Sequence, residues 1–271
     1  MNITDIMREW KPRALNERAG LDWWNNKAAH FGQLKLPTAE TSVAMRLIQE
    51  NGMINSGDRV LDVGCGGGRF SFALEKMGAR TVGTDFSPKM IEECNRNRSE
   101  LGMTGEFQIC NWHTAELDEF GWRKSFDLVL ANMTPAITSA ETFMKLSEAS
   151  KNWCLMVKPA RRTNSVLDAL NEMVGAEKDA DALDSSLAYA FDLLWLNGCE
   201  PRLEYERQVW EDDKPVENAV QEYTSRIRYS HDLTPEMEKK IEDYLREIAV
   251  DNIVHETTHT LIAAMYWQVK P

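Results

Sequence analysis

Two aspartates and a run of glycines are the residues whose types and spacing could hold a ligand. Residues 60–68 read VLDVGCGGG, in which a D-x-G-x-G-x-G pattern begins at Asp62. Glycines permit a tight turn and let a ligand approach the backbone closely. Asp85 follows Asp62 by 23 residues, and a carboxylate at that position can accept hydrogen bonds from both hydroxyls of a ribose. The spacing predicts a site for a nucleoside-containing cofactor.

A nicotinamide dinucleotide is one alternative ligand for this turn. Its fingerprint G-x-G-x-x-G, if it began at Gly64, would need glycine at position 69, where the sequence has Arg69. Asp62 before the turn also favours an amino-acid moiety over a pyrophosphate. A glycine-rich turn that binds nothing is the other alternative, and Asp85 at the right distance argues against it.

The stretch HETTH, His255–His259, is a second candidate for chemistry because it matches the zinc-protease signature H-E-x-x-H. On a helix, the two histidines would share a face and could hold one zinc ion. The segment is rich in threonine, isoleucine, tyrosine and tryptophan, which favours a strand. Residues four apart in a strand are about 13 Å apart, too far for two ligands at about 2.0–2.1 Å from one zinc. We therefore predict a strand and no metal site.

Alternating strands and helices must position the two aspartates. Apolar runs bounded by glycines and polar residues predict five strands, and segments with capping residues predict the helices between them. The predicted strands are RVLDVG, RTVGTD, GEFQIC, FDLVLAN and NWCLMV. Strands that alternate with helices imply βαβ units and a parallel sheet covered on both faces, which is an α/β fold.

The regions on either side of these units are predicted to add helices. A helix is expected to begin at Thr38, whose side chain can cap it, and to end at Gly52. Helical additions at Asn164–Asn197 and Val216–Val250 suggest a cap that selects the substrate, and the sequence from His255 onward suggests a final strand. The chain is predicted to be a single domain, 1–271, made of an N-terminal helical cap (1–55), a cofactor-binding core (56–160) and a C-terminal half with the cap additions and the last two strands (161–271).

Composition narrows the class of protein. The 271 residues are 43% hydrophobic, and 31 basic against 43 acidic residues give a net charge of −12, which disfavours a sequence-independent grip on nucleic acid. The five cysteines form no C-x-x-C pair and indicate free thiols in a reducing compartment. The sequence suggests neither a signal peptide nor a membrane span, so we expect a cytoplasmic protein.

Three segments together resemble a known family. VLDVGCGGG, GTDFS and FDLVLANM are similar to the class I S-adenosylmethionine-dependent methyltransferases, especially their small-molecule branch. The similarity extends over Val60 to Pro159. It implies a Rossmann-like sheet of seven mostly parallel strands with the last strand antiparallel, and S-adenosylmethionine bound at the carboxyl ends of the strands.

The resemblance also implies roles for individual residues. Asp62 would lie near the amine of the cofactor, Asp85 would hold the ribose and Phe86 would pack against adenine. Asn111 stands where the family usually has an aspartate facing the adenine amino group, and its amide oxygen can still accept a hydrogen bond. Asn132 would lie beside the reacting methyl group. The full set implied to contact the cofactor is Asp62, Gly64, Cys65, Gly66, Asp85, Phe86, Met90, Asn111, Trp112 and Asn132.

The acceptor of the methyl group is not specified by any motif. The methyl of a sulfonium is already activated, so a general base is needed only when the acceptor is protonated, and we assign no catalytic residue. The residues expected near the acceptor are Trp23, Trp24, His30, Phe31, Met133 and Thr134. A small-molecule acceptor is the leading hypothesis. A protein or RNA methyltransferase and a non-catalytic S-adenosylmethionine-binding protein are the alternatives, and the oligomeric state is left open.

Overall fold

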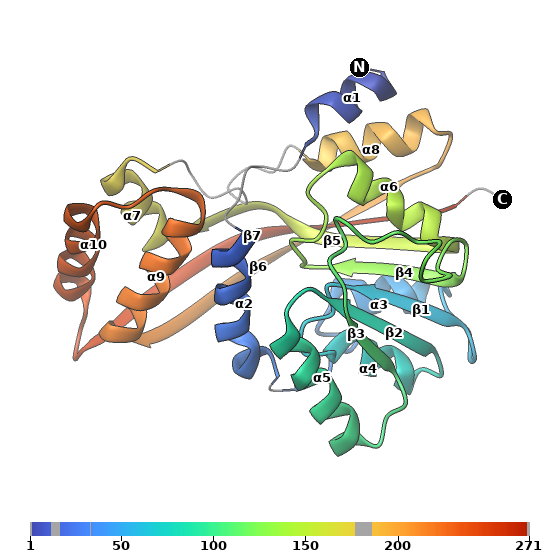
Figure 1. Ribbon diagram of the computed structural model, residues 1–271, viewed down its shortest axis with the longest axis horizontal. Coiled ribbons are helices and arrows are strands. Elements are labelled where there is room, and N and C mark those ends of the chain that lie inside the picture. Colours follow the sequence, from blue (N-terminus) through green and yellow to red (C-terminus); the bar gives the residue numbers. More distant parts are fainter. Residues whose placement is uncertain (1, 12–16, 33, 177–185, 270–271) are drawn as a thin grey trace.

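A computed structural model describes residues 2–11, 17–32, 34–176 and 186–269 (Figure 1). Within these ranges, seven strands form one sheet in the order β3-β2-β1-β4-β5-β7-β6. Their bounds are β1 (Arg59–Val63), β2 (Arg80–Asp85), β3 (Glu106–Ile109), β4 (Phe126–Asn132), β5 (Ser150–Asn164), β6 (Arg202–Pro215) and β7 (Ile253–Gln268).

The direction of the strands confirms the predicted Rossmann-like fold. Strands β1 to β5 pair in parallel, whereas β7 pairs antiparallel with both β5 and β6. The chain moves outward from β1 to β3 on one side and from β4 on the other. The carboxyl ends of β1 and β4 therefore flank a topological switch point, where open α/β sheets bind their ligands.

Ten helices are described in the same ranges, and most of them cover the sheet. One apolar core packs under α3 and α4, and another packs on the opposite face with α1, α6 and α8. The bounds are α1 (Ile3–Glu9), α2 (Glu17–Phe31), α3 (Val43–Glu50), α4 (Arg69–Lys76), α5 (Pro88–Leu101), α6 (Ala140–Ala149), α7 (Leu167–Val174), α8 (Ser186–Leu196), α9 (Val216–Ser230) and α10 (Pro235–Ile248).

Capping residues set the ends of several helices. Helix α5 begins after Ser87, whose side chain accepts a hydrogen bond from the backbone N–H of Met90. The predicted start of a helix at Thr38 is wrong, since α3 is capped by Ser42. The Thr38 N–H instead donates to the hydroxyl of Thr41 at 2.9 Å. This bond closes a local turn before the helix.

The strands β5, β6 and β7 extend well beyond the rest of the sheet. Val157 pairs with Asn132 at the end of β4, yet β5 continues to Asn164, with a register shift between Pro159 and Arg161. The predicted end of this strand before Pro159 is therefore wrong. The bulge offers a physical reason, because proline within a sheet is tolerated at such irregularities.

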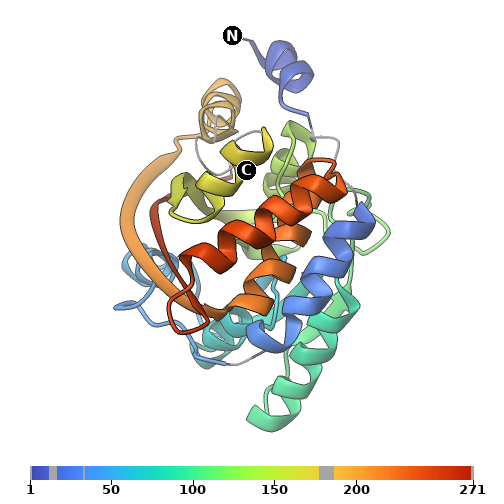
Figure 2. The same cartoon turned by 90° about the vertical axis from the view of Figure 1, so that its left-hand side faces the viewer.

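A separate apolar core covers the far end of these three strands. It joins α7, α9 and α10 to the sheet, with Tyr223 and Ile241 among its buried residues. We call these helices and the strand ends beneath them the distal lobe. Figure 2 shows α2 lying beside α9 of this lobe and α5, and α2 packs against both helices. Helix α5 belongs to the part of the chain predicted as the cofactor-binding core, residues 56–160, which we call the cofactor half.

Candidate functional site

The loop between β1 and α4 contains three glycines with left-handed backbone. Gly64, Gly66 and Gly68 have φ values of 69°, 54° and 85°, a region that side chains rarely adopt. A Cβ on Gly64 would stand 1.9 Å from Oγ1 of Thr134, so the loop after β4 closes against this glycine. Apart from Gly66 itself and its two neighbours in the chain, no heavy atom lies within 4 Å of the corresponding position on Gly66. The backbone at Gly66 is therefore open to a ligand.

Asp85 ties this loop to the end of β2. Its Oδ2 accepts from the Gly66 N–H at 3.1 Å and its Oδ1 accepts from the Ser87 N–H at 2.9 Å. Burial raises the pKa of Asp85, although these backbone hydrogen bonds oppose the rise. Each carboxylate oxygen has capacity for a further hydrogen bond, so the geometry suits a pair of ribose hydroxyls.

Asp62 lies beneath the loop and is 2% exposed. The Ser71 hydroxyl of α4 donates to its Oδ2 at 2.7 Å. Burial raises the pKa of Asp62 to about 6, against the lowering effect of the Ser71 hydrogen bond. Burial makes the ionised form of this side chain unfavourable in the free protein, and a cationic amine that binds beside it would stabilise that ionised form.

This pKa predicts a pH dependence for cofactor binding. Below about pH 6, Asp62 in the free protein is protonated, so binding an ammonium group must first remove that proton. The affinity for S-adenosylmethionine is expected to fall as the pH is lowered from 7 to 5, by about tenfold for one pH unit below the pKa. Titration calorimetry at several pH values measures this change. Asp62→Asn should bind weakly throughout and lose most of the pH dependence, and an equally steep dependence in that variant would contradict the role.

The remaining residues predicted to contact the cofactor differ in exposure. Phe86 and Asn132 are half-buried at the ends of β2 and β4, whereas Met90 is buried. Asn111 is exposed, and its side-chain oxygen accepts from the His113 N–H at 3.0 Å. Phe86, Asn111 and Asn132 lie at the carboxyl ends of β2, β3 and β4, and Met90 lies in the first turn of α5.

Two residues that were predicted to contact the cofactor, Trp112 and Cys65, contact other groups of the protein. The indole of Trp112 is 2% exposed and donates to the Thr142 carbonyl of α6 at 3.0 Å, so it packs in the core. The thiol of Cys65 lies 3.9 Å from the Cys94 sulfur. That hydrogen bond and burial raise the pKa of Cys65, which keeps it protonated and a poor nucleophile.

The residues predicted near the acceptor come from two elements. Met133 follows β4 with a φ of 52°, and strained backbone of this kind is often found at functional sites. The rings of Trp23 and Trp24 on α2 meet edge to face, with centroids 4.4 Å apart. The side chains of His30 and Phe31 lie outside what the structure describes.

Two asparagines at this site have no counterpart among the predicted residues. Asn25 of α2 accepts from the Ser87 hydroxyl at 2.7 Å, two residues after Asp85. Asn97 of α5 is 2% exposed and contacts the glycine-rich loop. The spacing of Met90, Cys94 and Asn97 along one helix face indicates an inward position for a polar residue, and this signal could have revealed Asn97.

His255 and His259 lie on β7, which confirms the predicted strand. Both side chains are exposed, and Nδ1 of His255 is 2.6 Å from Oδ1 of Asp213. In a strand these histidines are about 13 Å apart, which does not suit one zinc ion. No group of three or more His, Cys, Asp or Glu side chains in the described ranges could hold a metal.

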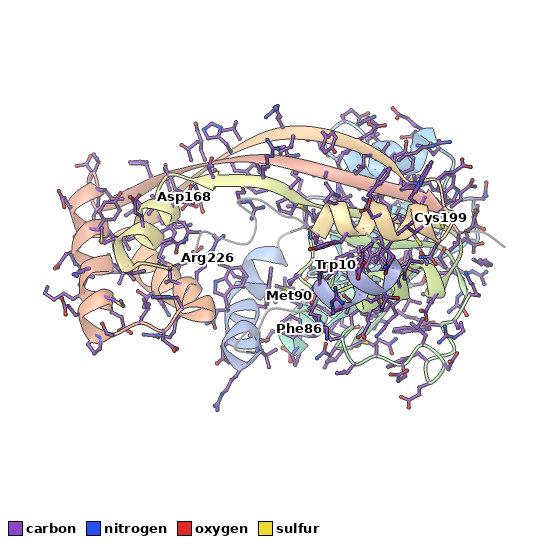
Figure 3. All side chains as sticks on the ribbon, turned by 90° about the horizontal axis from the view of Figure 1, so that it is seen from above. Trp10, Phe86, Met90, Asp168, Cys199 and Arg226 are labelled. Atoms are coloured by element: carbon purple, nitrogen blue, oxygen red, sulfur yellow. The ribbon has the colours of Figure 1, made fainter. Side chains whose placement is uncertain are left out.

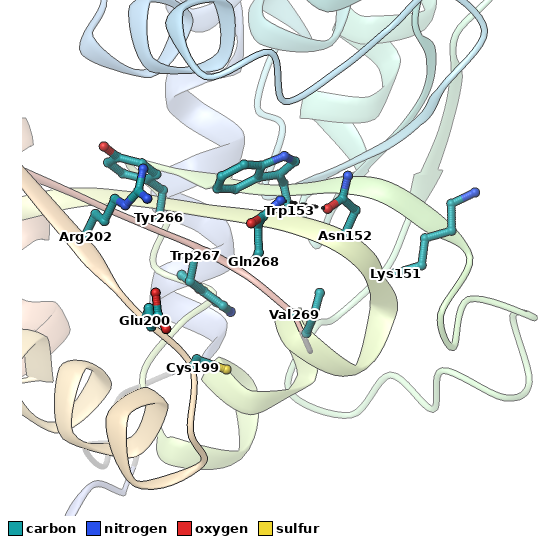
Figure 4. Close-up of a pocket in the computed structure, with 10 residues that line it drawn as sticks. All are labelled: Lys151, Asn152, Trp153, Cys199, Glu200, Arg202, Tyr266, Trp267, Gln268 and Val269. Carbon is teal, nitrogen blue, oxygen red and sulfur yellow. Dashed lines mark hydrogen bonds between the residues drawn. The ribbon is translucent and has the colours of Figure 1, made fainter. Parts of the chain in front are cut away.

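A hollow of about 430 Å³ lies at the opposite end of the sheet from the glycine-rich loop (Figure 4). Its walls come from the first residues of β5 and β6 and the last residues of β7. They lie at the edge of the sheet where the parallel strands have their amino ends and the antiparallel β7 has its carboxyl end, and α/β sheets do not place their ligands at this edge. We therefore do not assign the cofactor or the acceptor to this hollow.

A comparison with protein families agrees with the fold and the loop geometry. A family described as a methyltransferase domain matches residues 54–190, just over half of the 271 residues. The chain belongs to this methyltransferase family. The family match agrees with the resemblance of the sequence motifs to the class I S-adenosylmethionine-dependent methyltransferases.

Curated relatives are named for different acceptors. A 23S rRNA (uracil-C5) methyltransferase of Shewanella amazonensis is 31% identical over 108 residues, 40% of this chain and 22% of that protein. A ribosomal protein L11 methyltransferase of Helicobacter hepaticus is 28% identical over 54% of this chain and 44% of its own length. A ubiquinone biosynthesis O-methyltransferase of Coxiella burnetii is 33% identical over 32% of this chain and 35% of its own length. The aligned segments thus span less than half of each relative.

A solved structure shares the fold. Magnesium protoporphyrin IX methyltransferase from Synechocystis, crystallised with S-adenosylhomocysteine, superposes with a TM-score of 0.51 at 20% identity. The similarity covers 70% of this chain and 93% of that chain. In the parts of the chain that the structure describes, no helix is both long enough and apolar enough to cross a membrane.

Proposed function

We propose that this methyltransferase transfers the methyl group to a small molecule held between the glycine-rich loop and the distal lobe. The observation that carries the proposal is the extension of β5 past the carboxyl edge of the sheet. Asn132 pairs with Val157, and β5 continues for seven more residues into the distal lobe. A strand that extends directly beyond the carboxyl edge of the sheet favours an acceptor enclosed by the protein over an acceptor bound at an open surface.

Between the apolar core under α3 and α4 and the core of the distal lobe, one face of β7 carries polar side chains, which we call the floor. Val157 pairs with Ala264 of β7, and Val254 in the distal core lies ten residues further along the strand. At about 3.3 Å per residue, this interval is roughly 33 Å. Strand alternation places Glu256, Thr258 and Thr260 on the same face as Val254. We propose that the strip between Ile262 and Val254 receives the acceptor.

Residues of the cofactor half would bind and orient the methyl donor. The open backbone at Gly66 and the carboxylate of Asp85 fit the nucleoside and amino-acid parts of S-adenosylmethionine. When bound, this cofactor supplies a methyl group already activated on a sulfonium. The protein then has to align the acceptor with Asn132 and Met133 at the end of β4 and exclude water. Helix α2 supports exclusion, because it stands between the two halves of the molecule (Figure 3).

Turnover with a metabolite library tests the proposed acceptor class. The purified chain, supplied with S-adenosylmethionine, is expected to form S-adenosylhomocysteine above the acceptor-free rate with at least one small molecule. Turnover only with ribosomal RNA or ribosomal protein would contradict the proposal and favour the acceptors named for its relatives. Tight cofactor binding without turnover on any of these would favour a non-catalytic binding protein.

A pair of variants tests the location of the acceptor. Thr260→Met extends a buried side chain on the proposed floor, whereas Thr257→Met lengthens a side chain on the opposite face of the same strand. The first is expected to raise the KM for the acceptor about tenfold while leaving S-adenosylhomocysteine binding unchanged. The second should change neither value.

A further inference from the structure

One face of α5 holds the carbonyl groups of the glycine-rich loop. The Cys94 thiol donates to the Gly66 carbonyl at 2.9 Å, and the Asn97 side-chain amide donates to the Gly67 carbonyl at 3.2 Å. Both side chains are buried. Since the opposite side of the loop is tied to Asp85 through the Gly66 N–H, α5 and β2 together fix the backbone that approaches the cofactor.

The same face of α5 also holds α2. The Ser87 hydroxyl at the start of α5 donates to Oδ1 of Asn25 on α2. Three turns later, the side-chain nitrogen of Asn97 donates to the carbonyl of Gly32, just after the end of α2, at 3.1 Å. Asn97 thus uses one amide nitrogen to bond the cofactor loop and the end of α2 at the same time.

We infer that Asn97 is a positioning residue for cofactor binding. It contacts neither reacting atom in the proposed site, and it acts by holding the Gly67 carbonyl and the end of α2 in one arrangement. An apolar side chain at this position would leave both carbonyls without this donor, and buried carbonyls that lose a partner are costly. The loop and α2 would then sample other arrangements, so binding the cofactor would have to select the correct one. The inference concerns the cofactor alone and does not depend on the acceptor.

A comparison of two asparagines on α5 tests this role. Asn95 is half-buried and donates only to the Ile91 carbonyl of its own helix at 3.0 Å. The dissociation constant for S-adenosylhomocysteine, measured by calorimetry well below the melting temperature, is expected to rise at least about tenfold in Asn97→Leu. In Asn95→Leu it should stay within about twofold of wild type. Asn97→Ser, which retains a hydroxyl donor, should lie between the two.

A purely structural role would give a different pattern. Asn97→Leu with a lowered melting temperature but an unchanged dissociation constant would overturn the inference. If that variant does not fold, amide hydrogen exchange of the wild type decides the matter. Adding S-adenosylhomocysteine should slow exchange in residues 17–32 as well as in the glycine-rich loop, and slowing confined to the loop would overturn the coupling. Failure of the wild type to bind S-adenosylhomocysteine at all would overturn the role together with the use of the cofactor.

Discussion

Asp85→Ala is expected to weaken S-adenosylhomocysteine binding by at least about 100-fold. The substitution removes the proposed ribose acceptor, and hydrogen bonds to a charged group contribute about 1.5–3 kcal/mol each. It also releases the Gly66 and Ser87 N–H groups that the carboxylate now accepts, so the glycine-rich loop loses its attachment to β2. Both effects act in the same direction on affinity. Titration calorimetry with the product measures the change without the need for an acceptor.

A matched substitution separates the two contributions of Asp85. Asp85→Asn keeps one oxygen that can accept from a backbone N–H but removes the charge and one acceptor position. It is expected to bind more tightly than Asp85→Ala and more weakly than wild type. Circular dichroism melting of all three proteins checks that the fold persists. An alanine variant that is folded and binds within threefold of wild type would contradict the assignment.

Lys214→Met is expected to lower the free energy of unfolding by about 3 kcal/mol, because breaking a buried ion pair leaves the carboxylate of Glu256 without its partner. The ammonium of Lys214 lies 2.9 Å from Glu256 and 3.3 Å from Glu222, and its side chain is only 12% exposed. Glu222 also pairs with Lys27 of α2 at 2.7 Å. The loss should therefore loosen the distal lobe and its contact with α2. Urea denaturation measures the difference.

The pKa of Lys214 determines the pH range over which its ion pairs stabilise the folded protein. Burial pulls the pKa of Lys214 down, but the hydrogen bond to Glu256 and the charge of Glu222 outweigh it and raise the pKa above the ordinary value near 10.5. A raised pKa means that the folded state binds the proton more tightly. The stabilisation is fully present below about pH 10.5 and is lost as the pH rises through the higher folded pKa.

Lys239→Met is the control for this experiment. Lys239 is also a lysine paired with an acidic residue, Asp243, at 3.0 Å, but its side chain is 73% exposed. Exposed pairs of this kind contribute little to stability, so the change should stay within about 0.5 kcal/mol. A loss below 1 kcal/mol in Lys214→Met would show that Glu222 and Glu256 do not depend on this lysine.

Local patterns predicted the cofactor half well. The alternation of strands and helices along the chain, the glycine turn after Asp62 and the start of α5 at Ser87 follow from short-range signals, namely apolar runs, glycines and a capping serine. The last strand was also predictable, because β-branched and aromatic residues dominate β7. At the β1–α4 loop, the structure places Asp62, Gly66 and Asp85 together as the spacing requires.

The parts that were missed depend on contacts distant in sequence. Pro159 reads as the end of a strand, and only the pairing of β5 with β7 carries the strand past it. Trp112 follows the third strand as a cofactor residue would, yet its partner Thr142 lies 30 residues away. The role inferred for Asn97 depends on its hydrogen bonds to the carbonyl groups of Gly32 and Gly67, which are distant from it in sequence. No local pattern encodes such partners, so the sequence predicted the helices and the last two strands of the C-terminal half but not how they pack together.

The position of β7 within the sheet has a consequence for synthesis of the protein. β7 lies between β5 and β6, although both of those strands precede it in the chain. The ribosome delivers the strands of the cofactor half first, and they can pair as soon as residues 59–132 have emerged. Among the described strands, β6 has no partner other than β7. The nascent chain must therefore expose a 14-residue strand with a free edge until residues 253–268 are made. During translation this interval is the one in which the distal lobe is most open to chaperones and to aggregation.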